Sequence, residues 1–368
     1  MGSSTLPQPH VTVPVADVEQ LYCAVNNPGY EGAAIILAPG TYVLSATDGG
    51  GVARPNKGRL ELQRDMSLHG VTGDRSAVVI DATGLPDSSV SLPLPQQPTN
   101  RTAPVRIGRG SNTIEWLTVI GSPGAAAGIA TELEGTASAR IRVAHVVSSG
   151  CSRGLDVRNT SAANAGRRID AEIVENELIG PATGAAQGIR LANFPGTDGG
   201  AVVATMSGNR THGYQTGCLA VNNRASNGTV QVRSSGDRFF ANGLGCQVIG
   251  GTGRPGGENA DANSTRFEAH GSEFVDNTAS LAGAEQGGIS VIGGSANASN
   301  NTVSVALWGS KVSGYPGADF EAFGARADAG GTAGTNNHVT IELHGVSKHI
   351  DIPEPPPDPG NNTVTVIR

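Results

Sequence analysis

Short segments of alternating apolar and polar residues recur along most of this chain. In one group a glycine directly precedes the alternation, and the members begin at Gly128, Gly154, Gly188, Gly217, Gly245 and Gly288. Segments of a second group fall between them, for example at 140–143, 201–204, 229–232, 302–305 and 338–341. Alternation with a period of two predicts β-strands that bury one set of side chains and expose the other.

The recurrence itself predicts a repeat architecture. Successive glycines of the first group lie between 26 and 43 residues apart, which matches one solenoid coil with loops of different length inserted. Turn residues such as Asn-Gly, Ser-Gly and Gly-Gly separate the strands and accept the positive φ that sharp corners need. With two or three strands in each coil, the pattern predicts an all-β fold, a right-handed parallel β-helix that forms a single domain over residues 1–368.

Both ends of the chain carry signals for caps. Asp17 is placed to cap a short helix within residues 15–30, where the apolar residues follow helical spacing and form a plug for the open end. A proline-rich loop and a closing strand are expected within residues 350–368. One corner of the coils is expected to hold an amide ladder made of Asn159, Asn193 and Asn222.

Composition narrows the class of protein. The 53 glycines, 21 prolines and 15% charged residues favour a β-rich, turn-rich globular protein. A net charge of −7 without any run of Lys or Arg argues against nucleic acid as a partner. No apolar stretch is long enough to predict a membrane span. The four cysteines form no Cys-x-x-Cys pair and are expected to be buried apolar thiols.

Two N-terminal segments resemble the first coils of the pectin-lyase-like superfamily of right-handed β-helices. They are Ile-Ile-Leu-Ala-Pro-Gly-Thr-Tyr-Val-Leu at 35–44, and Met-Ser-Leu-His-Gly-Val at 66–71 followed by Val-Val-Ile-Asp at 78–81. The resemblance implies the fold and a carbohydrate-active enzyme, a polysaccharide lyase or a glycoside hydrolase. The superfamily also contains tailspikes and adhesive proteins, and the motifs of polygalacturonases and pectate lyases are absent.

The glycine-led strands suggest a candidate catalytic patch. When they are aligned on their glycines, Asp156 falls beside Arg190, and Glu132 falls beside Arg158, on the outward face. Gln247 lies further along the column of Asp156 and is expected to bind substrate. The alternative is an exposed ion-pair ladder that serves solubility alone.

Two chemistries suit this patch. In a lyase, an arginine neutralises the substrate carboxylate while His212 or Tyr214, from the turn before Gly217, removes a proton. In a hydrolase, Glu132 and Asp156, roughly 8 Å apart from strand and coil spacings, act as an inverting pair.

A second column consists of the residues before successive turn glycines: Ser207, Ser235, His270, Trp308 and His344. Trp308 and His270 are candidates for stacking against sugar rings, and packing at the corner is the alternative. His145 is expected to be a core or turn histidine rather than a catalytic one.

No cofactor is expected. The oxygen-bearing residues Glu258, Asn259, Asp261 and Asn263 suggest a Ca²⁺ site, and a solvated glycine-rich loop is the alternative.

The resulting hypothesis is a secreted or periplasmic carbohydrate-active enzyme that binds an oligosaccharide or polysaccharide along the outer face of a parallel sheet. The rival is a non-catalytic carbohydrate-binding, structural or adhesive β-helix, which the low aromatic content of 4% favours. A small-molecule isomerase on the same scaffold is a third possibility. An enzyme should show a groove and perturbed ionisation, whereas a binder should show a flat row of ordinary side chains.

Overall fold

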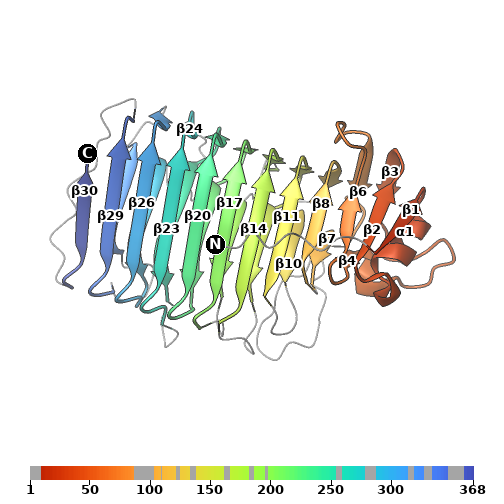
Figure 1. The fold of residues 1–368 in the computed structure, drawn as a ribbon, viewed down its shortest axis with the longest axis horizontal. Helices are drawn as coiled ribbons and strands as arrows, with labels where there is room; N and C mark the ends of the chain where they lie inside the picture. Colours follow the sequence, from red (N-terminus) through yellow and green to blue (C-terminus); the bar gives the residue numbers. More distant parts are fainter. Residues whose placement is uncertain are drawn as a thin grey trace.

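Three parallel sheets run along the molecule in the computed structural model (Figure 1). The structure describes residues 10–86, 103–108, 110–121, 125–132, 138–160, 166–181, 186–194, 198–253, 259–277, 287–313, 319–326, 334–346 and 360–368. Each full coil passes in turn through sheet 1, sheet 2 and sheet 3, and neighbouring strands of every sheet come from successive coils.

Sheet 1 has twelve strands among the described residues: β1 (Val11–Val15), β2 (Ala33–Leu37), β5 (Ser67–His69), β8 (Asn112–Glu115), β11 (Ala139–Ala144), β14 (Arg168–Val174), β17 (Ala201–Ser207), β20 (Thr229–Ser235), β23 (Ser264–His270), β26 (Thr302–Trp308), β29 (His338–His344) and β30 (Thr363–Ile367). Sheet 2 has nine short strands there: β3 (Gly40–Val43), β6 (Val78–Asp81), β9 (Thr118–Ile120), β12 (Val147–Ser149), β15 (Glu177–Ile179), β18 (Arg210–His212), β21 (Arg238–Phe240), β24 (Glu273–Val275) and β27 (Lys311–Ser313).

Sheet 3 contains the six glycine-led strands, from β10 to β25, and three others: β4 (Leu60–Leu62), β7 (Val105–Ile107), β10 (Ile129–Glu132), β13 (Arg153–Asn159), β16 (Gln187–Asn193), β19 (Thr216–Asn223), β22 (Leu244–Thr252), β25 (Gly287–Ser295) and β28 (Phe320–Arg326). The predicted parallel pairing of these strands is confirmed, since each residue pairs with its counterpart one coil away.

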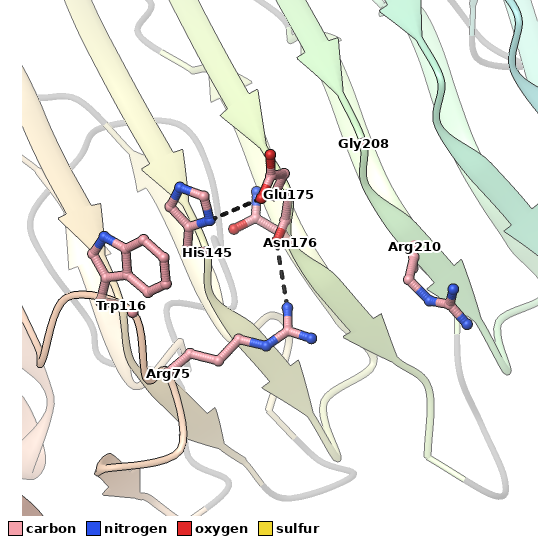
Figure 2. Close-up of a pocket in the computed structure, with 8 residues that line it drawn as sticks. Arg75, Trp116, His145, Glu175, Asn176, Gly208 and Arg210 are labelled. Atoms are coloured by element: carbon pink, nitrogen blue, oxygen red, sulfur yellow. Dashed lines mark hydrogen bonds and ion pairs between the residues drawn. The ribbon is translucent and has the colours of Figure 1, made fainter.

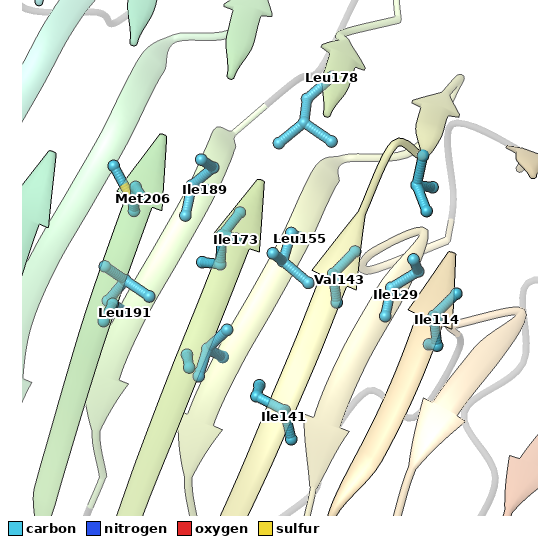
Figure 3. Close-up of a cluster of buried hydrophobic side chains, with 14 of the residues drawn as sticks. Ile114, Ile129, Ile141, Val143, Leu155, Ile173, Leu178, Ile189, Leu191 and Met206 are labelled. Atoms are coloured by element: carbon cyan, nitrogen blue, oxygen red, sulfur yellow. The ribbon is translucent and has the colours of Figure 1, made fainter. Parts of the chain in front are cut away.

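A continuous apolar core fills the inside of the coils (Figure 3). The alternation along β11 and β14 turns Ile141, Val143 and Ile173 inward, and Leu155 and Ile189 face them from sheet 3. Burial of this apolar surface is the main favourable contribution to the stability of the solenoid.

The recurring glycines mark places where the core has no room for a side chain. A Cβ added at Gly188 would lie 1.9 Å from Cγ2 of Thr211, and one added at Gly154 would lie 2.8 Å from Cβ of Leu178. Side chains from sheet 2 occupy the space that a larger residue at the start of sheet 3 would need. The glycine pattern that revealed the repeat is therefore a packing requirement.

Buried asparagines stack from coil to coil. The predicted ladder is confirmed, because Nδ2 of Asn159 donates to Oδ1 of Asn193, and Nδ2 of Asn193 donates to Oδ1 of Asn222. A second ladder, not predicted, has the members Asn263, Asn301, Asn337 and Asn362. A third, also not predicted, has the members Asn176, Asn209 and Asp237. These amides satisfy buried backbone groups at the corners as well as one another.

The predicted caps are present where the structure describes them. Helix α1 (Val18–Val25) begins after Asp17, whose carboxylate accepts a hydrogen bond from the backbone amide of Gln20 at 2.9 Å. A 3₁₀ turn (Pro28–Tyr30) follows, and α1 packs against β1 and β4 at the N-terminal end (Figure 1). Strand β30 pairs in parallel with β29 as the last strand of sheet 1. The proline-rich segment falls outside the described residues.

A second 3₁₀ segment (Pro55–Gly58) lies between β3 and β4. No helix among the described residues is long and apolar enough to cross a membrane. The expectation of buried thiols holds for Cys151, Cys218 and Cys246 but is wrong for Cys23, which is exposed on the outer side of α1.

We predict that Asn301→Ala destabilises the protein by about 3 kcal/mol, because the change leaves the buried backbone and side-chain donors of Asn263 without their acceptor and removes one of the donors to Oδ1 of Asn337. Urea unfolding followed by circular dichroism measures this. Thr302→Ala, at an exposed position next along the chain, is the control. Equal unfolding midpoints for the two variants would show that the ladder adds nothing to stability.

Candidate functional site

The predicted columns on sheet 3 are present. Asp156 pairs in register with Ala130 on one side and Arg190 on the other, and Arg158 pairs with Glu132. Gln247 lies further along the first column, between Leu219 and Ser290.

The side chains of this patch do not form an exposed ladder, so that alternative is wrong. Asp156 is 0% exposed, and Arg158 and Arg190 are 7% and 9% exposed. Nε and Nη2 of Arg190 donate to the two carboxylate oxygens of Asp156 at 2.8 and 2.5 Å, and Nε of Arg158 lies 2.9 Å from the same carboxylate. Phe194 lies under both guanidinium groups.

Charge pairing decides the ionisation of Asp156. Burial raises the pKa of this carboxyl, but the guanidinium groups of Arg158 and Arg190 outweigh burial and hold the pKa at about 2. A carboxylate held ionised in this way is a weak base and no proton donor near neutral pH. Asp156 is therefore a clamp that fixes two arginines.

The remaining residues predicted for this patch are dispersed. Glu132 has its backbone in β10, and its side chain lies outside the described part of the structure, so its pairing with Asp156 in a hydrolase stays a prediction. Tyr214, the other candidate base for a lyase, has a ring that is fully buried in the core, and burial raises the pKa of its phenol far above the usual range. His212 lies on sheet 2 rather than beside Asp156.

A different cluster of polar and aromatic side chains occupies the corner between sheets 1 and 2. In each coil a turn joins the sheet 1 strand to the sheet 2 strand. From β8 onward, within the described residues, the first residue of this turn has positive φ. In the later coils this residue is a glycine: Gly208, Gly236, Gly271, Gly309 or Gly345. In three consecutive earlier coils it is Trp116, His145 and Glu175, with φ of 58°, 55° and 51°. His145 thus lies at a turn, one of the two positions expected for it. That it is not catalytic stays a prediction, and the function proposed below reverses it.

These three side chains line a cleft of about 480 Å³ together with Arg75 and Arg210 (Figure 2). The rings of Trp116 and His145 stack with centroids 3.9 Å apart and an angle of 12° between their planes. Nδ1 of His145 lies 3.3 Å from Oε2 of Glu175. The result is an aromatic surface beside an imidazole and a carboxylate.

Two arginines line the same cleft, but only Arg75 points towards Glu175, whereas the side chain of Arg210 points away from Trp116 and His145 (Figure 2). Arg75 extends from the connection between β5 and β6 and donates to Oε2 of Glu177 at 2.8 Å and to the backbone oxygen of Glu175 at 3.3 Å. Arg210 is exposed and forms no ion pair with the described carboxylates, and its guanidinium lies 5.2 Å from the centroid of Phe240. The guanidinium of Arg210, at the edge of the cleft, can therefore bind an anionic ligand.

His212 extends this surface along sheet 2. Its ring stacks on Phe240 at 4.8 Å, and Nε2 lies 3.8 Å from Oε1 of Glu177. Partial burial lowers the pKa of His212, and the Glu177 carboxylate opposes this shift. The residue predicted as a base beside the sheet 3 patch thus neighbours the corner cleft instead.

The second predicted column, the residues before the turn glycines, is confirmed by the register of sheet 1. Trp308 stacks between His270 and His344, with centroid distances of 4.5 and 5.3 Å. The rings cover one another on the outer surface, where His270 and His344 are exposed. Their role in binding substrate stays a prediction, as does that of Gln247.

The suggested Ca²⁺ ligands are not gathered into a site. Glu258 lies outside the described residues, and Asn263 belongs to the second amide ladder. Oδ1 of Asp261 accepts a hydrogen bond from the backbone amide of Ser299 at 2.7 Å. Among the described residues, no group of three or more His, Cys, Asp or Glu side chains is arranged to hold a metal ion.

Solved structures share this architecture. The A-module of mannuronan C-5 epimerase AlgE4 from Azotobacter vinelandii superposes with a TM-score of 0.50 at 15% identity, covering 96% of this chain and 94% of the module. The chain is a right-handed parallel β-helix. The architecture implied by the resemblance to the pectin-lyase-like superfamily is thereby confirmed, and at this identity the likeness concerns the fold alone.

Two further β-helices show weaker likeness. Pectate lyase Pel9A matches with a TM-score of 0.43 at 13% identity, covering 95% of this chain and 79% of that protein. The A-module of epimerase AlgE6 from Azotobacter vinelandii matches with a TM-score of 0.41 at 15% identity, covering 95% and 93%. No family model matches the sequence, and no curated protein does so significantly.

The repeat in the sequence also contains a signal for the corner cleft. Glycines at the turn after sheet 1 were recognised in the later coils, and their counterparts Trp116, His145 and Glu175 follow from the same alignment. Arg75 has no such signal, because its contact with Glu177 joins segments 102 residues apart.

We predict that Asp156→Asn destabilises the protein by about 3 kcal/mol or more, because two buried guanidinium groups lose their counter-charge. The pKa of Asp156 is about 2 in the folded state, below the ordinary value of 3.8, so its stabilising effect is present above the ordinary value. This effect disappears as the pH falls through about 2. Denaturant unfolding at a series of acid pH values should therefore show a steeper loss in the wild type than in Asp156→Asn. Parallel curves would contradict the clamp.

Proposed function

We propose that this β-helix acts on an acidic polysaccharide at the corner cleft, removing the proton next to a uronate carboxylate as a lyase does. The observation that carries the proposal is the replacement of the turn glycine by Trp116, His145 and Glu175 in three consecutive coils. The glycine-led face of sheet 3, where Asp156 is a buried clamp, is the less favoured position for the chemistry.

Backbone strain supports a functional reason for these residues. Positive φ is free of cost for glycine but costs other residues of order 1 kcal/mol or more each. Later coils of the same corner take glycine, so the turn itself does not require large side chains. The three residues have in common that they project into one cleft, where they stack or pair with one another.

Each group in the cleft suits one part of the reaction. The indole of Trp116 offers an apolar face on which a sugar ring stacks. Arg210 and Arg75 are placed to bind the uronate carboxylate, which makes the neighbouring C5 proton more acidic. His145 is the base, because its imidazole lies in the cleft beside the carboxylate of Glu175, which orients the ring and stabilises the imidazolium formed in the reaction.

These groups, together with water, are sufficient for a β-elimination. His145 takes the proton from C5, and the electron pair left behind forms a double bond between C4 and C5. The bond from C4 to the glycosidic oxygen then breaks, and this oxygen leaves with a proton from water or a neighbouring acid. The products are an unsaturated uronide and a shortened chain.

The substrate class also fits the fold neighbours. AlgE4 is named for action at C5 of mannuronan and Pel9A for action on pectate, and both names refer to acidic polysaccharides. Location outside the cytoplasm, secreted or periplasmic, is part of the same proposal. The other candidate, a carbohydrate-binding β-helix without catalysis, is favoured by the stacked rings of His270, Trp308 and His344.

We predict that His145→Ala lowers kcat on a responsive acidic polysaccharide by about 100-fold or more, because the base is removed. Ultraviolet absorbance of unsaturated uronides, recorded over a panel of polysaccharides, measures this. His338→Ala is the matched control, since this exposed histidine lies at the opposite end of a sheet 1 strand and hydrogen-bonds Thr363.

The same panel separates the alternatives. Unsaturated products in undiminished yield from His145→Ala would overturn the catalytic assignment. Absence of products from every polysaccharide, together with retention of one of them in an affinity gel, would establish the binding protein instead.

We predict that Trp116→Ala raises KM about tenfold and that Trp116→Phe restores most of the loss, because an aromatic face rather than the indole nitrogen holds the sugar ring. Initial rates over a range of substrate concentrations measure both constants. An unchanged KM in Trp116→Ala would show that the indole does not bind the sugar ring.

A further inference from the structure

The corner that holds the cleft continues past it to the far end of the solenoid. Beyond Glu175, the turn positions are glycines, and the residues before the first of them are Ser207 and Ser235. We call the exposed line of Ser207, Gly208, Ser235, Gly236 and Gly271 the small-residue track. Its end meets the aromatic ladder of His270, Trp308 and His344.

All three features lie on one line because strands stack in register. Sheet 1 places Val174, Ser207, Ser235, His270 and Trp308 in a single column, each from the next coil. Neighbouring strands are about 4.8 Å apart, so Trp308 lies about 20 Å from the coil of Glu175 along the axis. The cleft and the aromatic ladder therefore lie along the same edge of the solenoid.

Lack of space does not explain why the small-residue track has glycines at its turns. A Cβ added at Gly236 or Gly271 would meet no atom within 4 Å, so neither glycine is needed to avoid a clash. The left-handed turn favours glycine here but accepts tryptophan, histidine and glutamate two to five coils earlier along the same corner. The track is thus the part of this edge where the sequence places no bulky group.

Basic side chains flank the track on both sides. Arg210 and Arg238 project from sheet 2, where both guanidinium groups lie against Phe240 at 5.2 and 4.6 Å. On the side of sheet 1, Arg233 has a 62% exposed side chain and contacts Glu268 at 3.1 Å. Arg238 contacts Glu273 at 3.2 Å, and its side chain is 39% exposed.

We propose that the whole corner is an extended binding track for a linear acidic polysaccharide, which lies across the coils from the cleft over the small residues to the aromatic ladder. This inference rests on the proposed function for the cleft and names the form of its substrate. Flanking guanidinium groups bind the carboxylates of the polymer, and the aromatic ladder binds one of its rings through the exposed imidazole of His270, whose neighbour on the side away from Trp308 is the small Ser235.

Dependence on chain length is the signature of such a track. Short oligouronates fill the cleft alone, whereas long ones also reach the ladder, so affinity should rise with length. Isothermal titration with a size series of oligogalacturonates and oligomannuronates gives the ratio of long-chain to short-chain affinity. We expect Trp308→Ala to reduce this ratio about tenfold, because the His270 ring loses the indole that holds it in place.

A second variant obstructs the track without removing a contact. Gly236→Asn adds a side chain in open space, and asparagine tolerates the left-handed φ of 63° at this position. We expect it also to lower the length ratio. Gly51→Asn, at an exposed glycine with φ of 83° and open space in a loop far along the chain, is the matched control, and Thr302→Ala on the same strand is the control for Trp308.

The outcomes separate this inference from the function proposed for the cleft. A length ratio that is the same in Trp308→Ala, Gly236→Asn and their controls overturns the track, even when His145→Ala abolishes turnover. A ratio lowered in both variants, with turnover unaffected by His145→Ala, supports the track and overturns the cleft chemistry. Affinity that does not rise with chain length in the wild type overturns the track directly.

Discussion

Hydrogen bonding between parallel strands in strict register is the constraint on which this molecule depends. Each residue of a strand lies directly over its counterpart from the previous coil, as Asp156 lies between Ala130 and Arg190. One position in the repeat therefore becomes a column along the whole solenoid. Because neighbours in a column are only about 4.8 Å apart, a change at one coil is felt by the next.

The columns explain both stability and the arrangement of functional groups. Inward columns bury apolar side chains, and corner columns of asparagine satisfy backbone groups that the turns leave buried. Outward columns bring together residues that are distant in sequence, so Trp116, His145 and Glu175 meet although about thirty residues separate each from the next. The fold converts a repeated turn into an extended edge, and the replacement of glycine in a few coils converts part of that edge into a cleft.

The architecture was predictable from the sequence because its signals are local and repeated. Alternation, glycine spacing and the asparagines at 159, 193 and 222 indicated the sheets, the coils and one ladder correctly. Side-chain direction at the turns was less predictable. Tyr214 appeared to be an outward base, yet it fills the space that Gly154 and Gly188 leave inside the coil.

The sheet 3 patch shows a second limit of sequence reasoning. Alignment placed Asp156 beside Arg190 correctly, but burial decides whether such a group is a catalytic acid or a clamp, and burial depends on the surroundings of the whole column. Likewise, the contact of Arg75 with Glu177 needs the three-dimensional path of the loop between β5 and β6. Long-range contacts of this kind leave no periodic trace in a single sequence.

The position of a bound substrate tests the central claim most directly. A crystal structure of His145→Ala soaked with a short oligouronate should show one sugar ring on the indole of Trp116, with its carboxylate at Arg210 or Arg75. Electron density for the sugar on the outer face of sheet 3, beside Arg190 and Gln247, would contradict this claim. It would show that the substrate binds at the glycine-led strands instead.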